Sequence, residues 1–290
     1  MKSIAFLGTG LMGEPMARRL VAAGLPVAVW NRTESKAKGV VDAGARWAQS
    51  PAAAVAGATV VVSMLTDGRA FDAAVWETGA ADAIARGAVV IDMSTTSPSV
   101  AREQAARFAA RGVEYVDAPV SGGTRGAAAG SLAIMAGGDV SVIERLAKVF
   151  EPMGRCKRVG PVGAGQLCKL ANQLIVAVTI GAVAEALVMA EKGGADPAAV
   201  RDALSGGFAD SRILSEHGKR MIARDFVPGG AVHNQIKDLD AAVAFAKSSG
   251  FSLPLLTRVQ ELFHQLRAHG GGGLDHSALF LEIERIASAS

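Results

Sequence analysis

The segment GTGLMG, residues 8–13, constrains the fold of this chain more than any other stretch. It directly follows a short apolar run and directly opens a segment with helical periodicity. In that context Gly8 permits a tight turn, Gly10 lets a ligand approach the main chain, and Gly13 lets the helix pack close to the strand. A helix N-terminus behind such a loop favours the negative charge of a pyrophosphate. The loop is therefore predicted to bind a dinucleotide through Gly8, Gly10, Leu11, Met12 and Gly13.

Strand and helix patterns alternate through the first half of the chain. Runs rich in Val, Ile and Ala recur at residues 3–8, 26–31, 58–65, 87–94, 113–120 and 131–138, with helical patterns between most of them. Strands that are apolar on both faces are typical of a parallel sheet covered by helices, so we expect an α/β Rossmann domain over residues 1–161. Residues 162–290 read as helix after helix, beginning with a long one over 163–194. We therefore predict an all-α C-terminal domain for substrate binding and dimerisation, joined to the first domain by that long interdomain helix.

The end of the second predicted strand bears on which dinucleotide binds. A site for NAD usually ends this strand in Asp or Glu, which holds the ribose 2′-hydroxyl. Here the position holds Asn31, followed by Arg32 and Thr33. A guanidinium beside a hydroxyl suits a 2′-phosphate, so these three residues predict NADP as the preferred cofactor. NAD stays the alternative because Glu34 is a possible displaced acidic partner.

Composition excludes several other classes of protein. The net charge is only +3 and the basic residues are scattered, which argues against a nucleic-acid partner. The most apolar stretch, residues 174–190, is interrupted by Thr179 and Glu185, so a buried helix is expected and not a membrane span. Two cysteines, Cys156 and Cys168, and no export signal indicate the reducing cytoplasm. Metal-ligand spacing is absent, and no metal is predicted.

Two further stretches carry chemistry. In DAPVSGGTRGA, Ser121, Gly122 and Gly123 follow a predicted strand, where a hydroxyl and consecutive main-chain N–H groups can hold a carboxylate; an ordinary turn explains them equally well. In VGAGQLCKLANQ, Lys169 and Asn172 share one helical face at the start of the long helix. A lone lysine at a helix start is more often structural than catalytic.

Six motifs in order resemble the β-hydroxyacid dehydrogenase family, which includes 3-hydroxyisobutyrate dehydrogenase, tartronate semialdehyde reductase and the succinic semialdehyde (glyoxylate) reductases. They span nearly the whole chain: GTGLMGEPMA, VIDMSTTSP, DAPVSGGTRGAAAGSLAIMAGG, GAGQLCKLANQ, AEALVMAEKGGADP and KDLDAA. The resemblance implies an NAD(P)-dependent oxidoreductase that interconverts a small semialdehyde and its hydroxy acid. It also implies a homodimer or homotetramer.

The resemblance assigns roles residue by residue. Lys169 becomes the proton donor for the developing alkoxide, which an ammonium can also stabilise, and Asn172 its partner. Ser121, Gly122 and Gly123 inherit the substrate carboxylate. Asp238, beside Lys237, orients the cluster around that lysine and is counted with the substrate-binding residues. The cofactor contacts implied outside the glycine loop are Met64, Leu65, Ser94, Thr95 and Lys237.

The chain departs from the family pattern upstream of the KDL motif. Gly230 stands where members often have an aromatic residue, and Asn234 stands where they have an apolar one. A smaller and more polar pocket is implied, which favours tartronate semialdehyde, glyoxylate or succinic semialdehyde as the substrate. An imine reductase of the same architecture is one alternative, although such enzymes typically lack the lysine. A non-catalytic dinucleotide-binding interaction module is the other.

Overall fold

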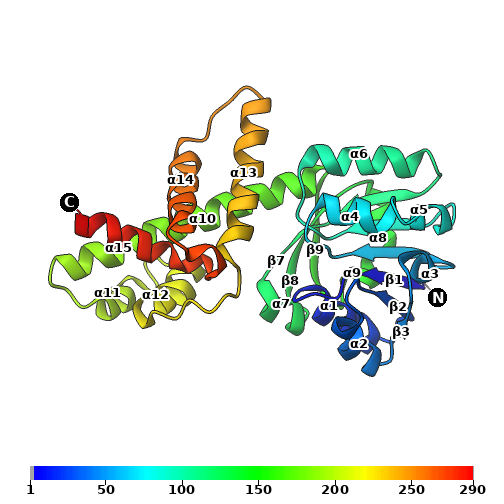
Figure 1. Ribbon diagram of the computed structural model, residues 1–290, viewed down its shortest axis with the longest axis horizontal. Coiled ribbons are helices and arrows are strands. Elements are labelled where there is room, and N and C mark those ends of the chain that lie inside the picture. The colour runs from blue at the N-terminus through cyan, green and yellow to red at the C-terminus, as the bar shows by residue number, and fades with distance from the viewer. Residues whose placement is uncertain (1–2, 290) are drawn as a thin grey trace. The chain divides into compact units, whose positions relative to one another are not determined.

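The structure is a computed structural model that describes residues 3–289. The chain divides into two compact units, Met1–Lys169 and Leu170–Ser290. The first unit contains a β-sheet and helices, whereas the described residues of the second unit form only helices and short helical turns (Figure 1).

The sheet of the first unit has nine strands in its described part, in the order β3-β2-β1-β4-β5-β6-β8-β7, with β9 pairing with β8. The strands are β1 (Ile4–Leu7), β2 (Val27–Trp30), β3 (Arg46–Trp47), β4 (Val60–Ser63), β5 (Val89–Asp92), β6 (Glu114–Asp117), β7 (Val120–Ser121), β8 (Leu132–Gly137) and β9 (Gly154–Gly160). Strands β1 to β6 are all parallel, while β8 runs antiparallel to β6 and β7. From β1 the chain continues to β2 and β3 on one side of β1, and it then returns to form β4 on the other side. The direction of the strand order therefore reverses between β1 and β4. In open α/β sheets ligands bind at the carboxyl ends of the strands beside such a reversal.

Alternate side chains of each strand enter two different cores, as a sheet buried on both faces requires. Phe6 and Val62 face one core with the helices α1, α2, α7, α8 and α9, whereas Leu7 and Val61 face the other with α3, α4, α5 and α6. Helices α4 and α6 are seen on one side of the sheet and α1 and α2 on the other (Figure 1). The helices are α1 (Gly13–Ala22), α2 (Lys38–Asp42), α3 (Pro51–Val55), α4 (Gly68–Val75), α5 (Ala80–Ala83), α6 (Pro98–Ala109), α7 (Gly123–Ala129), α8 (Val140–Arg145) and α9 (Ala147–Phe150), with the 3₁₀ turn η1 (Glu34–Ala37).

The sequence patterns located most of this sheet but missed its edges. The expected strands correspond to β1, β2, β4, β5, β6 and β8, which confirms the Rossmann-like fold. Strand β9 was not predicted because its sequence, GRCKRVG, is mostly exposed and carries charges in place of an apolar alternation. Strand β3 has only two residues, too few for any pattern.

Helix α10 (Ala164–Lys192) begins in the first unit and continues into the second. The second unit then contains α11 (Pro197–Leu204), the π-helical segment η2 (Ile213–Gly218), α12 (Lys219–Ala223), α13 (Val232–Ser248), α14 (Pro254–Ala268), the 3₁₀ turns η3 (Gly271–Gly273) and η4 (His276–Ala278), and α15 (Leu279–Ala289). As the sequence predicts, Asp196 caps α11, since its side chain accepts a hydrogen bond from the Ala198 N–H. A single core that includes Ile180, Leu239 and Phe263 joins these helices.

Candidate functional site

The glycine loop lies at the strand-order reversal, between the carboxyl ends of β1 and β4. Gly8 has φ +99°, and a Cβ there would collide with the carbonyl oxygen of Met64. A Cβ on Gly13 would collide with the carbonyl oxygen of Gly8, whereas one on Gly10 would meet nothing within 4 Å. Gly8 and Gly13 are thus required by the packing of the loop itself, and Gly10 leaves open space above it.

The loop fits the pyrophosphate of a dinucleotide. No side chain caps the N-terminus of α1, which leaves this end of the helix open to an anion. In its first turn Pro15 has no N–H, and the Glu14 N–H donates to the Gly10 carbonyl oxygen at 3.0 Å. The Thr9 hydroxyl is buried without a hydrogen-bond partner, and Leu11 is 82% exposed. A phosphate resting on the loop would satisfy the helix terminus.

The end of β2 supports the glycine loop through Asn31. Its Oδ1 accepts a hydrogen bond from the Thr9 main-chain N–H at 3.0 Å, and its Nδ2 donates to the carbonyl oxygen of Thr33 at 2.8 Å. Asn31 therefore holds two loops together. Arg32 and Thr33 are exposed, and the described residues contain no ion pair of Arg32.

The predicted cofactor contacts after β4 and β5 are joined by hydrogen bonds. The Leu65 main-chain N–H donates to the Ser94 hydroxyl at 3.0 Å. The Ser94 N–H and the Ser63 hydroxyl donate to Asp92 Oδ1 at 3.1 and 2.8 Å. Asp92 is 1% exposed, and burial raises the pKa of its carboxyl despite these hydrogen bonds. The structure thus identifies Asp92, which the sequence analysis did not single out, as a buried support for the loops that contain Met64, Leu65, Ser94 and Thr95.

The turn after β7 has the geometry of an anion site. Gly122 and Gly123 have φ values of +136° and +61°, which only glycine adopts readily, and Gly123 opens α7. Ser121 is half-buried at the end of β7. Consecutive N–H groups in such a turn form a concave donor surface that suits a carboxylate.

The first turn of α10, which leads to Lys169, is held by a buried carboxyl at the end of β6. The Asp117 carboxylate accepts from the Gly163 N–H and the Gln166 N–H, both at 2.8 Å. Burial raises the pKa of Asp117 to about 6, although these two hydrogen bonds lower it and the nearby Asp92 raises it further. The glycines Gly137 and Gly165 leave the space that the carboxyl fills.

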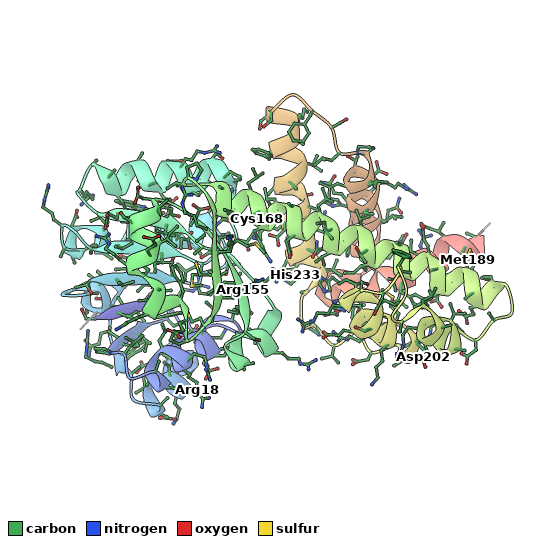
Figure 2. All side chains as sticks on the ribbon, turned by 180° about the vertical axis from the view of Figure 1, so that it is seen from behind. Arg18, Arg155, Cys168, Met189, Asp202 and His233 are labelled. Carbon is green, nitrogen blue, oxygen red and sulfur yellow. The ribbon has the colours of Figure 1, made fainter. Side chains whose placement is uncertain are left out.

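Gln166 fastens the same turn to the loop after β5. Its Oε1 accepts from the Thr96 N–H at 2.9 Å and its Nε2 donates to the Ser94 carbonyl oxygen at 2.8 Å, and Gln166 is 0% exposed. Lys169 follows one helical turn later and is 8% exposed. Cys168, labelled in Figure 2, is a half-buried free thiol on the same turns. The sequence motifs singled out Lys169 but neither Asp117 nor Gln166.

In the second unit, Asn172 belongs to a series of polar side chains joined by hydrogen bonds. Its Nδ2 donates to Gln173 Oε1 at 2.9 Å, and Gln173 Nε2 donates to Asp238 Oδ2 at 2.7 Å. Lys237 Nζ lies 3.0 Å from Asp238 Oδ1 in an ion pair. The buried Gln235 donates to the Gln173 carbonyl oxygen at 3.2 Å. The structure brings the predicted residues Asn172, Lys237 and Asp238 together and adds two glutamines that the sequence did not single out.

Gly230 is held by a second buried carboxylate. Asp275 Oδ2 accepts from the N–H groups of Gly229 and Gly230 at 2.9 and 3.1 Å and pairs with Arg220 Nη1 at 3.0 Å, while Oδ1 accepts from the Ser277 hydroxyl at 2.7 Å. Burial raises the pKa of Asp275, but the charge of His276 and these hydrogen bonds outweigh it and lower the pKa to about 2. Asp275 is the principal support of this loop.

One cluster has atoms spaced for a metal ion. Ligand atoms of His217, Asp275 and His276 lie within 4.8 Å of one another. The Arg220 guanidinium, however, places a positive charge on the same carboxylate, and His276 Nδ1 bonds with Gln235 Oε1 at 3.2 Å. The arrangement suits an internal ion pair better than a cation.

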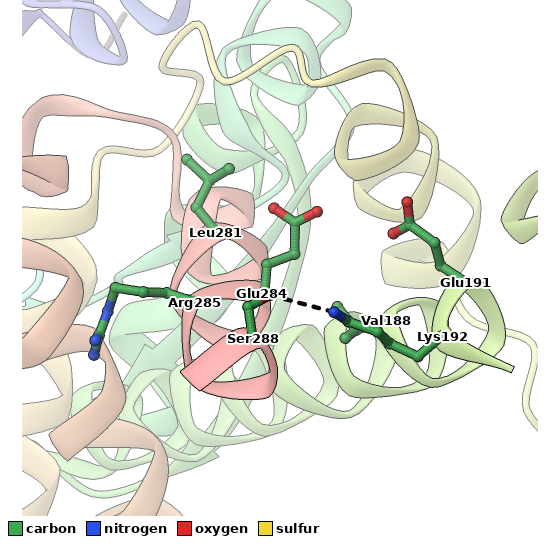
Figure 3. A pocket seen from close by; sticks show the side chains of 7 residues that line it. All are labelled: Val188, Glu191, Lys192, Leu281, Glu284, Arg285 and Ser288. Carbon is green, nitrogen blue, oxygen red and sulfur yellow. Dashed lines mark hydrogen bonds between the residues drawn. The ribbon is translucent and has the colours of Figure 1, made fainter. Parts of the chain in front are cut away.

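A surface hollow of about 480 Å³ lies elsewhere in the second unit, between the end of α10 and α15 (Figure 3). Lys192 Nζ donates to the Ser288 hydroxyl across it at 3.3 Å. The lining residues are Val188, Glu191, Lys192, Leu281, Glu284, Arg285 and Ser288, none of which is a predicted site residue.

Comparison with known proteins decides the family. Residues 3–162 match the model of the NAD-binding domain of 6-phosphogluconate dehydrogenase, and residues 163–282 match the NAD-binding model of NADP-dependent 3-hydroxyisobutyrate dehydrogenase. The chain is 42% identical over 287 residues to the 2-hydroxy-3-oxopropionate reductase of Escherichia coli, covering 98% of both chains. The chain belongs to the β-hydroxyacid dehydrogenase family. This confirms the resemblance drawn from the motifs.

Two further members of the β-hydroxyacid dehydrogenase family agree. A probable mitochondrial 3-hydroxyisobutyrate dehydrogenase-like protein of Arabidopsis thaliana is 39% identical, over 99% of this chain and 86% of that one. A 3-hydroxyisobutyrate dehydrogenase of Mycobacterium tuberculosis, solved with L-serine, has a TM-score of 0.89 at 35% identity, over 97% of this chain and 98% of that one. The protein is thus an NAD(P)-dependent dehydrogenase of this family, with a nicotinamide dinucleotide as its cofactor.

Helix α10 alone among the described helices is long and apolar enough to span a membrane. Length and composition are weak evidence, because the core helix of a soluble protein passes the same test. In the most apolar 18-residue stretch of α10, 44% is buried inside the protein.

Proposed function

We propose that this protein is an NADPH-preferring reductase that interconverts a short, polar semialdehyde and its hydroxy acid. The observation that carries the proposal is Lys169, buried on the helical turn that Asp117 and Gln166 fix to the cofactor loops. The E. coli relative is named for 2-hydroxy-3-oxopropionate, which is tartronate semialdehyde, so we favour that substrate over glyoxylate, succinic semialdehyde and the 3-hydroxyisobutyrate type.

NADPH, when bound, supplies a hydride to the carbonyl carbon of the substrate. The residues of the chain supply the rest. Ser121, Gly122 and Gly123 hold the substrate carboxylate through the hydroxyl and the main-chain N–H groups. The Lys169 ammonium stabilises the negative charge that develops on the carbonyl oxygen and donates the proton. Asn172, one turn later on the same helix, and Asp238 assist in orienting the substrate.

The Lys169 role is tested with Lys169→Met, which keeps the length of the side chain without its charge. We expect kcat for tartronate semialdehyde to fall by about a hundredfold or more, in the range typical of a lost general acid, with the Kd for NADPH unchanged. Activity is measured as NADPH oxidation with a panel of small aldehydes. Turnover at the native rate would rule out the proton-donor role, and reduction of methylmalonate semialdehyde alone would overturn the substrate assignment.

NADP preference rests on Arg32, which is exposed at the end of β2 next to Thr33. A charged hydrogen bond to the 2′-phosphate is worth about 1.5–3 kcal/mol, so Arg32→Gln should lower kcat/KM for NADPH about tenfold to a hundredfold. The value for NADH should stay the same, since NADH has no 2′-phosphate. Equal losses with the two cofactors would exclude the contact.

We also propose that the enzyme is cytoplasmic and forms homodimers or homotetramers through its helical unit. Two observations support these assignments: Cys156 and Cys168 are free thiols, and α10 exposes the apolar side chains of Ile175 and Met189, the latter visible in Figure 2. Light scattering of the purified protein measures the oligomeric state.

A further inference from the structure

Gln166 is the most completely bonded side chain among the described residues around the Lys169 turn. Each atom of its amide and its main-chain N–H makes one hydrogen bond of 2.8 or 2.9 Å, and the residue is 0% exposed. A main-chain carbonyl only accepts and a main-chain N–H only donates. The amide therefore has a single allowed orientation, with Nε2 toward Ser94 and Oε1 toward Thr96.

These bonds connect three places that the proposed function uses. The Ser94 hydroxyl accepts from the Leu65 N–H, so Ser94 links the Gln166 amide to the loops after β4 and β5. On the other side, the Gln166 N–H bonds to Asp117 at the end of β6. Lys169 lies three residues later on the same helical face. The Gln166 side chain thus connects the predicted cofactor loops to the helical turn that bears the proposed proton donor.

We propose that Gln166 is a positioning residue that sets the placement of Lys169 against the cofactor loops. The inference rests on the proposed function, and it predicts two effects of losing the amide. The loops that hold Leu65 and Ser94 become less ordered, so NADPH binds more weakly. The Lys169 ammonium is also placed less well, so kcat falls beyond what weaker binding explains, because small misplacements of reacting groups are costly.

The chemistry of the amide explains why glutamine stands there. Asp92 and Asp117 already place two buried carboxyls at this edge of the sheet, and burial raises the pKa of each. An amide makes both side-chain bonds without adding a third charge. A protonated glutamic acid has the same pattern of one donor and one acceptor, whereas a carboxylate would oppose an oxygen to the Ser94 carbonyl oxygen.

The experiment compares Gln166→Met, Gln166→Glu and the control Gln104→Met. Gln104 is also a buried glutamine of the first unit, 2% exposed, and it bonds to Trp76 and Asp72, neither of which is a predicted site residue. The measurements are the Kd for NADPH by fluorescence, kcat and KM across pH 5.5–9, and the melting temperature. The titratable neighbours of position 166 are Asp92, Asp117, Tyr115, Lys169 and, beside Gly163, Arg102.

We expect both methionine variants to melt at lower temperature, but only Gln166→Met to lose function. With two hydrogen bonds removed, its kcat should fall about tenfold and its Kd for NADPH rise several-fold. Gln166→Glu should approach native kcat at acid pH and lose it as the pH rises and the side chain ionises, a transition in addition to that of Asp117, which the native enzyme shares.

Two results would overturn the proposal. One is Gln166→Met with kcat and Kd within twofold of Gln104→Met while both are folded. The other is Gln166→Glu with the native pH profile. The Kd for NADPH needs no turnover, so the effect on the cofactor loops is decided even if Lys169→Met shows that Lys169 is not the proton donor.

Discussion

Replacing Asp117 by asparagine tests the electrostatics beneath the proposed catalytic turn. The native carboxyl is 0% exposed and accepts two main-chain N–H groups of the α10 turn. Burial raises its pKa from 3.8 to about 6, so the folded protein binds this proton more tightly than the unfolded chain does. The contribution of Asp117 to the stability of the native protein is therefore fully present below pH 3.8. It is lost as the pH rises through about 6.

The magnitude follows from the two pKa values. With 3.8 in the unfolded chain and about 6 in the folded protein, ionisation of Asp117 lowers the free energy of unfolding by about 1 kcal/mol between pH 5 and pH 8. The amide of the Asp117→Asn variant does not titrate, so the variant escapes this loss. It carries instead a pH-independent cost, because an amide offers one acceptor to two N–H donors, and an unsatisfied buried donor costs about 1–3 kcal/mol.

The assay is urea denaturation of both proteins at pH 5, 6, 7 and 8. We expect the difference in free energy of unfolding to shift by about 1 kcal/mol in favour of Asp117→Asn across that range. Asp139→Asn is the control, since the exposed Asp139 caps α8 and has a lowered pKa, so it does not titrate above pH 5. A difference that stays constant from pH 5 to pH 8, or shifts in favour of the native protein, would refute the reasoning.

Three further outcomes are expected. Gly13→Ala should lower the melting temperature because its Cβ meets the glycine loop, whereas Gly10→Ala should keep it and weaken NADPH binding by fluorescence titration; equal melting losses would contradict this. Asp275→Asn should lower the free energy of unfolding by about 2 kcal/mol at pH 7 in urea denaturation, from a folded-state pKa of about 2 against 3.8. That deficit should shrink as the pH falls from about 5 toward 2, and a deficit independent of pH would argue against the ionised carboxylate. Ile175→Lys with Met189→Lys should shift the proposed oligomer toward monomer in light scattering, and an unchanged mass would exclude this face of α10.

Sequence patterns predicted the centre of the sheet because its strands are buried on both faces and therefore uniformly apolar. Strand β5 is VVID and is fully buried. The edge strand β9 is exposed and charged, so nothing in its residues distinguishes it from a loop. Pairing with β8 makes it a strand, and pairing is not visible in composition.

The candidate site divides in the same way. Gly8, Ser121 and Lys169 were predicted because each stands in a local motif. Gln166 was missed because its partners are Ser94 and Thr96, some seventy residues away, and a glutamine within a helical pattern reads as surface. Asp92 and Asp117 did leave a signal, since each is a carboxylate at the carboxyl end of a buried strand, a position where polar groups are seldom without a task.

The side chain of Asn31 limits how the proposed preference for NADPH could be redirected toward NADH. The common strategy places an acid at the end of the second strand, where it binds the ribose. Here an aspartate could still accept from Thr9, but it would set an oxygen against the carbonyl oxygen of Thr33, to which Asn31 now donates. The same substitution that gains a ribose contact thus loosens the loop predicted to bind the pyrophosphate. A change of coenzyme is better sought at positions 32 and 33, where the side chains are exposed and the fold does not depend on them.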